Sequence, residues 1–135
     1  MFKLDDRLAN DTVELGKIGF TKVLMCKDSN YPWVILVPEI DNATEIHQLT
    51  ANQQTELMQT ITFIAEKMEV EFKADKINIG ALGNVVKQLH IHVVARYETD
   101  IAWPGPIWGQ HPMKQYDEAT MVTMINKLKQ LFELS

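Results

Sequence analysis

The sequence lacks the features that define several large classes of protein. It contains one cysteine, Cys26, so no internal disulfide can form, and a lone thiol is typical of a reducing compartment. Thirteen basic residues against eighteen acidic ones give a net charge of −5, which disfavours a broad surface for nucleic-acid polymers. No apolar run approaches the roughly 20 residues of a membrane span, and residues 1–7 have no signal-peptide core. We therefore expect a single soluble, cytoplasmic domain over residues 1–135, with no membrane partner.

The first third of the chain predicts short antiparallel strands. Residues 20–26 and 33–37 are rich in apolar side chains, and residues 27–32 between them contain Asp, Ser, Asn and Pro, which favour a tight reversal. A weaker strand is predicted over residues 12–15, and another over residues 75–82. The pattern indicates a β-hairpin followed by further strands later in the chain.

Two segments have the spacing of amphipathic helices. Thr50 is a plausible N-cap, and Gln53 completes a capping box before a long helix whose apolar side chains recur at helical spacing. Asp117 is placed to cap a second helix over about residues 117–133. Clustered strands with two separate helices favour an α+β fold over a parallel α/β fold.

The most informative segment is residues 88–96, where polar and apolar side chains alternate. Gln88, His90 and His92 would project from one face of a strand, with neighbours about 6.6–7 Å apart. Buried polar groups cost on the order of 1–3 kcal/mol each unless they are hydrogen-bonded. This face is therefore open to solvent or lines a pocket.

Three interpretations of the histidine strand remain open from the pattern itself. The face could be an exposed edge, or it could hold a metal ion, although His47 and His111 are remote in sequence as third ligands. The third interpretation is catalysis on phosphorus, in which a neutral imidazole attacks a phosphoryl centre and is covalently modified. The other polar groups of the strand, and the backbone N–H groups of residues 80–85, could then hold the phosphate oxygens.

Residues 88–94 resemble the motif His-φ-His-φ-His-φ-φ (φ, apolar) of the histidine triad (HIT) family, except that Gln88 replaces the first His. The resemblance extends over about residues 10–110 and includes Asn78, the closing Arg96 and the Trp-Pro-rich segment 103–109. It is similar to a bacterial-type branch with Gln at the first position. The resemblance implies a HIT-like antiparallel sheet of about five strands, with one long helix and a C-terminal helix.

The resemblance also implies roles for individual residues. His90 matches the family's nucleophile, which attacks the α-phosphate of a nucleotide, and His92 matches the histidine that contacts phosphate oxygens. Gln88 can only exchange hydrogen bonds, so we expect it to tune the rate or the leaving-group preference. The remaining residues assigned to nucleotide binding by this resemblance are Asn78, Gly83, Asn84 and Val85 near the phosphate, and Asp28 or Asn30 near the ribose.

The implied activity is nucleotide hydrolysis or nucleotidyl transfer, on substrates such as a dinucleoside polyphosphate or a nucleoside phosphoramidate. The family's covalent route needs no tightly bound cofactor, although Mg²⁺ could accompany a polyphosphate substrate. Family members commonly form homodimers, so a homodimer is expected. The alternative is a nucleotide-binding HIT module with little or no turnover.

Four aromatic or sulfur-containing positions have competing interpretations. Trp33 begins a strand and is predicted to lie in the core or in a cleft wall, with contact to a nucleobase as the alternative. Trp103 and Trp108 lie in a stretch rich in Pro and Gly, and are predicted either to pack on the sheet or to cover the site. Cys26 is not expected to be a nucleophile, because it ends an apolar strand and has no evident base beside it.

Overall fold

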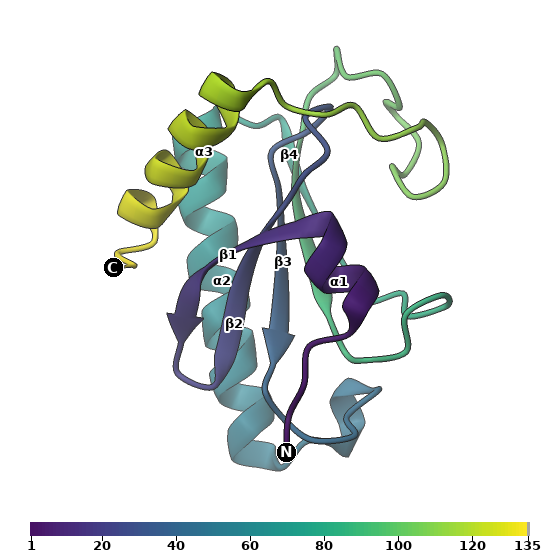
Figure 1. Ribbon diagram of the computed structural model, residues 1–135, viewed down its shortest axis with the longest axis vertical. Coiled ribbons are helices and arrows are strands. Elements are labelled where there is room, and N and C mark those ends of the chain that lie inside the picture. Colours follow the sequence, from purple (N-terminus) through teal and green to yellow (C-terminus); the bar gives the residue numbers. More distant parts are fainter. Residues whose placement is uncertain (135) are drawn as a thin grey trace.

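The computed structural model describes residues 1–134 and contains one five-stranded antiparallel sheet (Figure 1). The strands are β1 (Thr12–Ile18), β2 (Thr21–Cys26), β3 (Trp33–Pro38), β4 (Lys76–Gly80) and β5 (Ile91–Arg96). The helices are α1 (Asp6–Asp11), the short 3₁₀ helix η1 (Ile46–Gln48), α2 (Ala51–Phe72) and α3 (Glu118–Leu131). The strand order is β1-β2-β3-β5-β4, so β5 lies inside the sheet. The expected α+β fold, with its open five-stranded sheet, is confirmed.

The expected hairpin is formed by β2 and β3, with Val23 opposite Leu36. β5 pairs with β3 on one side, where His92 lies opposite Ile35, and with β4 on the other. Every residue of β5 is buried, which suits a central strand of nearly continuous apolar sequence. The histidine-bearing strand is therefore held on both sides by neighbouring strands.

Different helices cover the two faces of the sheet (Figure 1). α2 and α3 enclose the main apolar core, which includes Leu36 and Val93. On the other face, Leu8 of α1 packs in a smaller apolar cluster with Ile35. Because side chains alternate along a strand, His92 lies on the α1 face while Val93 enters the main core. The polar side of β5 thus faces the side of the sheet that the short helix α1 covers.

The helix termini follow the predicted signals. The Thr50 hydroxyl accepts the Gln53 N–H, and the Gln53 side chain accepts the Thr50 N–H, which completes the capping box of α2. The Asp117 carboxylate accepts the Thr120 N–H at 2.8 Å and caps α3. Within residues 1–134, no helix is long and apolar enough to cross a membrane.

Two local features differ from the sequence-based prediction. The strand expected over residues 88–96 begins only at Ile91, because the Gln88 carbonyl accepts a hydrogen bond from the His90 ring and the Leu89 N–H donates to the Ala43 carbonyl. These backbone groups pair outside the sheet. Helix α1 was not predicted, because six residues are too few to show helical periodicity.

Candidate functional site

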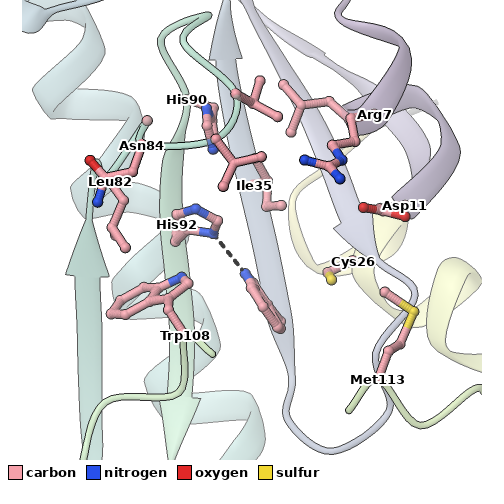
Figure 2. A pocket seen from close by; sticks show the side chains of 15 residues that line it. Arg7, Asp11, Cys26, Ile35, Leu82, Asn84, His90, His92, Trp108 and Met113 are labelled. Atoms are coloured by element: carbon pink, nitrogen blue, oxygen red, sulfur yellow. Dashed lines mark hydrogen bonds between the residues drawn. The ribbon is translucent and has the colours of Figure 1, made fainter. Parts of the chain in front are cut away.

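One pocket lies on the α1 face of the sheet, beside the start of β5 (Figure 2). Its volume of about 440 Å³ is in the range of small-molecule sites, and its wall is mostly apolar. Polar side chains from three parts of the chain converge on it: Arg7 and Asp11 of α1, Asn84 of the segment before β5, and the two histidines His90 and His92. An apolar cleft with a few aimed polar groups suits a ligand with an aromatic part and an ionic part.

His90 is held by the backbone of its own segment. Its ring Nδ1 lies 2.7 Å from the Gln88 carbonyl oxygen, and only 7% of the residue is exposed. A carbonyl oxygen can only accept a hydrogen bond, so Nδ1 carries the proton in this arrangement. The neutral ring then has its lone pair on Nε2. His90 therefore presents an unprotonated Nε2, an atom that can serve as a nucleophile or a base.

His92 is held by a side chain from the neighbouring strand. The indole Nε1–H of Trp33 donates to Nδ1 of His92 at 3.0 Å (Figure 2). An indole N–H can only donate, so Nδ1 of His92 is the acceptor and the neutral ring carries its proton on Nε2. The two imidazoles thus have opposite tautomers: His90 offers an Nε2 lone pair, and His92 offers an Nε2–H donor.

The two histidine rings are in contact and share a low-polarity environment. Their centroids lie 4.9 Å apart with the planes at 70°. Burial, together with the adjacent His90, lowers the pKa of His92 to about 3. His92 therefore stays neutral at physiological pH and acts as a hydrogen-bond donor without a charge.

Aromatic rings enclose His92. Its ring lies 5.6 Å from the Trp33 ring and 5.3 Å from the Trp108 ring, centroid to centroid. Gly80 of β4 leaves the space that Trp108 fills, since a Cβ at that position would lie 3.2 Å from the indole. Of the two predicted alternatives for Trp108, the structure favours the one in which it covers the site.

The predicted phosphate loop lies beside the histidines. Gly83, Asn84 and Val85 all line the same pocket as His90 and His92. Gly83 has a φ of 69°, a left-handed conformation that glycine adopts without strain. The structure therefore brings five of the nine sequence-predicted site residues together around one cavity.

Gln88 is placed differently from the two histidines. Its side-chain Nε2 donates to the Lys3 carbonyl and its Oε1 accepts the Asp5 N–H, both at 2.8 Å. The amide is thus occupied by the N-terminal segment and is absent from the main pocket. The three polar side chains expected on one strand face therefore do not stay together. His90 and His92 line the pocket, whereas the Gln88 amide binds the backbone of Lys3 and Asp5.

Three further predicted site residues do not line the pocket. The Asp28 carboxylate accepts the N–H groups of Asn30 and Lys114, and the Asn30 side chain donates to the Pro112 carbonyl. Asn78 Oδ1 accepts from the buried guanidinium of Arg96 at 2.7 Å. These groups join the chain's loops and strands, and their contact with a nucleotide stays a prediction.

The sequence analysis missed the contribution of α1. Arg7 and Asp11 line the pocket from this helix, and Figure 2 shows both side chains across the cavity from His90. Their spacing of four residues places both side chains on one face of a helix. This spacing could have indicated a shared site only if α1 had been predicted. Cys26 also lines the wall, but burial raises the pKa of its thiol to about 12, so it is not a nucleophile at neutral pH.

Binding of a metal ion by His90 and His92 would need a third ligand. Within residues 1–134, no three side chains of His, Cys, Asp or Glu converge in a geometry that could hold an ion. His47 is exposed on η1, and His111 is exposed with its ring against the Ile101 carbonyl.

Comparisons with known proteins agree with this fold. A family model described as HIT domain matches residues 10–99. A histidine triad protein from Marinobacter aquaeolei VT8 is 44% identical, with 98% of this chain and 97% of that chain covered and a TM-score of 0.96. Histidine triad proteins from Bradyrhizobium japonicum (40% identical, 97% and 98% covered, TM-score 0.94) and Sinorhizobium meliloti 1021 (38% identical, 96% and 96% covered, TM-score 0.92) are similar. No curated protein matches the chain.

The five-stranded sheet and its helices define a small α+β domain of HIT-like fold. With the family model matching two thirds of its length, this chain belongs to the HIT family. Proteins of this family are generally nucleotide hydrolases or nucleotidyl transferases.

Proposed function

We propose that the protein hydrolyses or transfers at the α-phosphate of a nucleotide conjugate, through a covalent nucleotidyl-His90 intermediate. One observation carries this proposal: the Gln88 carbonyl oxygen lies 2.7 Å from Nδ1 of His90 and accepts its N–H, which leaves the Nε2 lone pair for attack. A nucleophile needs an available lone pair and a fixed direction, and this hydrogen bond supplies both. When Nε2 bonds to phosphorus the ring becomes cationic, and the same carbonyl stabilises that charge.

The surroundings of His90 suit a phosphoryl group under attack. The Nε2–H of His92, in the adjacent ring, is a neutral donor for a phosphate oxygen. Residues 83–85 form a loop beside it whose backbone N–H groups can hold further oxygens. Pre-positioned donors of this kind stabilise the charge that develops on the phosphate oxygens in the transition state.

The apolar remainder of the pocket suits a nucleoside. Trp33, Ile35, Leu8 and Val86 line it, and an aromatic base can bury its faces there. Arg7 and Asp11 at the far side offer one donor group and one acceptor group to the rest of the ligand. Asp11 is in our proposal the candidate acceptor for ribose hydroxyls, in place of Asp28 and Asn30.

The direct test is turnover of a panel of nucleotide conjugates by the wild type and by His90→Ala, with His47→Ala as a control at an exposed histidine. The proposal expects release of mononucleotide by the wild type and the control. It expects a loss of at least about 10³-fold in kcat for His90→Ala, since no second group can take the nucleophile's role. Tight nucleotide binding with no turnover by any of the three would instead favour the binding-module alternative.

Four further properties belong to this proposal. Gln88 marks the branch with a substituted first triad position. A polyphosphate substrate brings its own Mg²⁺, so no resident cofactor is needed. The buried, free Cys26 suits a cytoplasmic location.

The exposed edge of β4, where Ile79 is half exposed, is available for pairing with a second copy of the chain. Light scattering would test this homodimer.

A further inference from the structure

We propose that Trp33 holds His92 as a hydrogen-bond donor that never acts as an acid, and that the site is consequently built for a leaving group that departs as an anion. This inference rests on the proposed function and narrows its substrate class to nucleotide phosphoanhydrides, in preference to phosphoramidates. Its starting point is the Trp33 to His92 hydrogen bond at 3.0 Å.

Phosphoanhydrides and phosphoramidates differ in whether the leaving group must be protonated. When Nε2 of His90 attacks the α-phosphorus of an anhydride, the bond from phosphorus to the bridging oxygen breaks. The leaving phosphate departs with the electron pair and needs no proton. When the same attack breaks a phosphorus–nitrogen bond, an amine must leave, and it leaves only if a proton reaches its nitrogen. General acids supply such protons and contribute roughly 10²–10⁴-fold in rate.

Within residues 1–134, neither His92 nor Gln88 supplies such an acid to the atoms beside His90. The lone pair of His92 at Nδ1 is occupied by the Trp33 indole, and the ring resists protonation because it is buried beside His90. Gln88 cannot donate a proton to a leaving group, and its amide is held by Lys3 and Asp5. Among the pocket-lining residues within 1–134, the remaining titratable groups are Arg7, Asp11 and the Cys26 thiol, all on the α1 side of the cavity.

An independent observation favours an anionic leaving group. Arg7 is the one Lys or Arg side chain among the lining residues of the described chain, and Figure 2 shows its guanidinium across the pocket from His90. Within residues 1–134 this guanidinium forms no ion pair and no side-chain hydrogen bond, although Asp11 lies one helical turn away. An unpaired guanidinium suits the phosphate oxygens of a polyphosphate and offers nothing to a departing amine.

The second half of the reaction needs no acid either. Water attacks the α-phosphorus of nucleotidyl-His90, the bond from phosphorus to Nε2 breaks, and the electron pair returns to the ring. The proton of the attacking water passes to solvent, and His90 regains its Nε2 lone pair with the Nδ1 proton still on the Gln88 carbonyl. Each step balances without a proton from His92.

The first experiment measures the tautomers directly, without turnover. Long-range ¹H–¹⁵N NMR of the wild type should show the proton on Nε2 of His92 and on Nδ1 of His90. Trp33→Phe keeps an aromatic ring and removes the N–H, so His92 should then sample both tautomers. The matched control is Trp108→Phe, which removes an N–H that is not bonded to His92, and which should leave the His92 tautomer unchanged. A proton on Nδ1 of wild-type His92 would overturn the assignment.

The second experiment compares two substrates with the same nucleoside, a dinucleoside polyphosphate and an alkylamine nucleoside phosphoramidate. We expect kcat/KM to be at least about 100-fold higher for the polyphosphate, the factor that a missing general acid removes. Trp33→Phe should lower kcat for the polyphosphate with little change in KM, because the Nε2–H donor of His92 is then present in only part of the molecules. Arg7→Gln should lower kcat/KM for the polyphosphate alone, and Arg7→Lys should recover part of it.

The outcomes separate this inference from the function on which it rests. Equal or faster cleavage of the phosphoramidate, abolished by His90→Ala, would overturn the substrate class and leave the nucleotidyl-His90 route intact. Cleavage of neither compound would overturn both proposals as statements about activity. An equal effect of Arg7→Gln on both substrates would contradict the assignment of Arg7 to the leaving group.

Discussion

The side-chain amide of Gln88 is hydrogen-bonded to Asp5, 83 positions earlier in the chain, at 2.8 Å. The same amide donates to the Lys3 carbonyl, so both its donor and its acceptor are used on the N-terminal segment. Asp5 in turn caps α1 by accepting the Arg7 N–H. The residue at the first triad position therefore fastens the segment that places Arg7 at the pocket.

Replacing Gln88 by Ala should release this segment. Two hydrogen bonds are lost, and we expect the free energy of unfolding to fall by about 1–2 kcal/mol in urea titrations. Amide exchange should accelerate locally over residues 3–7, because the Asp5 N–H and the Lys3 carbonyl lose their hydrogen-bond partners. Gln110→Ala, at an exposed loop position, is the matched control and should change neither quantity. Unchanged amide exchange at Asp5 and Arg7 in Gln88→Ala would show that the two hydrogen bonds of the Gln88 amide are not what orders α1.

The buried His92 makes the stability of the protein depend on pH. Its pKa is lowered to about 3 in the folded state from 6.5, so between these values the unfolded chain binds a proton that the folded chain does not. Stability should therefore fall as the pH drops below 6.5, and the loss should level off near pH 3. We expect about 3 kcal/mol of this loss between pH 7 and pH 4.

The measurement is chemical unfolding at a series of pH values for the wild type and His92→Asn. The difference in pH dependence between the two proteins isolates the contribution of this histidine. His47→Gln removes an exposed histidine and should keep the wild-type profile. Parallel profiles for the wild type and His92→Asn would mean that His92 is not held neutral by the fold.

A buried ion pair holds the segment that carries Trp108. Arg96 is 1% exposed and binds Asp100 through Nε at 2.8 Å, and it also donates to the Gly105 carbonyl at 2.8 Å. Burial opposes the charge on Asp100, but the hydrogen bonds and charge of Arg96 outweigh it and lower the pKa of this carboxyl. The pair therefore ties β5 to the irregular segment after it.

Asp100→Asn should leave the Arg96 charge buried and uncompensated. We expect a loss of about 3–5 kcal/mol in the free energy of unfolding at pH 7, measured by urea or thermal unfolding. Because the folded pKa is lowered, the contribution of Asp100 is present above the unfolded pKa and disappears as the pH falls through the folded value, so wild type and variant should converge in acid. Asp6→Asn removes an exposed carboxylate 3.7 Å from Lys3 and should cost less than about 1 kcal/mol.

The sequence predicted those parts of the fold that depend on local chemistry. The turn of residues 27–32 between two apolar runs forms the β2–β3 hairpin, and the Thr50–Gln53 box begins α2 where expected. Asp117 caps α3 as predicted. In each case the signal and its structural consequence lie within a few residues of each other.

The parts that were missed depend on contacts between distant residues. The sequence predicted Asp28 or Asn30 near the ribose, and in the structure the Asp28 carboxylate accepts the N–H of Lys114, 86 positions away, a contact that no local pattern indicates. Gln88 was placed in line with the histidines because its partners, Lys3 and Asp5, lie at the other end of the chain. The assignment of His92 as a donor needed Trp33, whose strand pairs with β5 only in the folded sheet.

The measurement that tests the account most directly is a rapid-quench experiment with a dinucleoside polyphosphate. The reaction is stopped in alkali, which preserves phosphorus–nitrogen bonds to histidine, and the protein is digested and mapped by mass spectrometry. We predict a nucleotidyl group on His90 that forms before product is released and is absent in His90→Ala. A nucleotidyl group on His92 instead, or steady turnover by His90→Ala, would contradict the central role of His90.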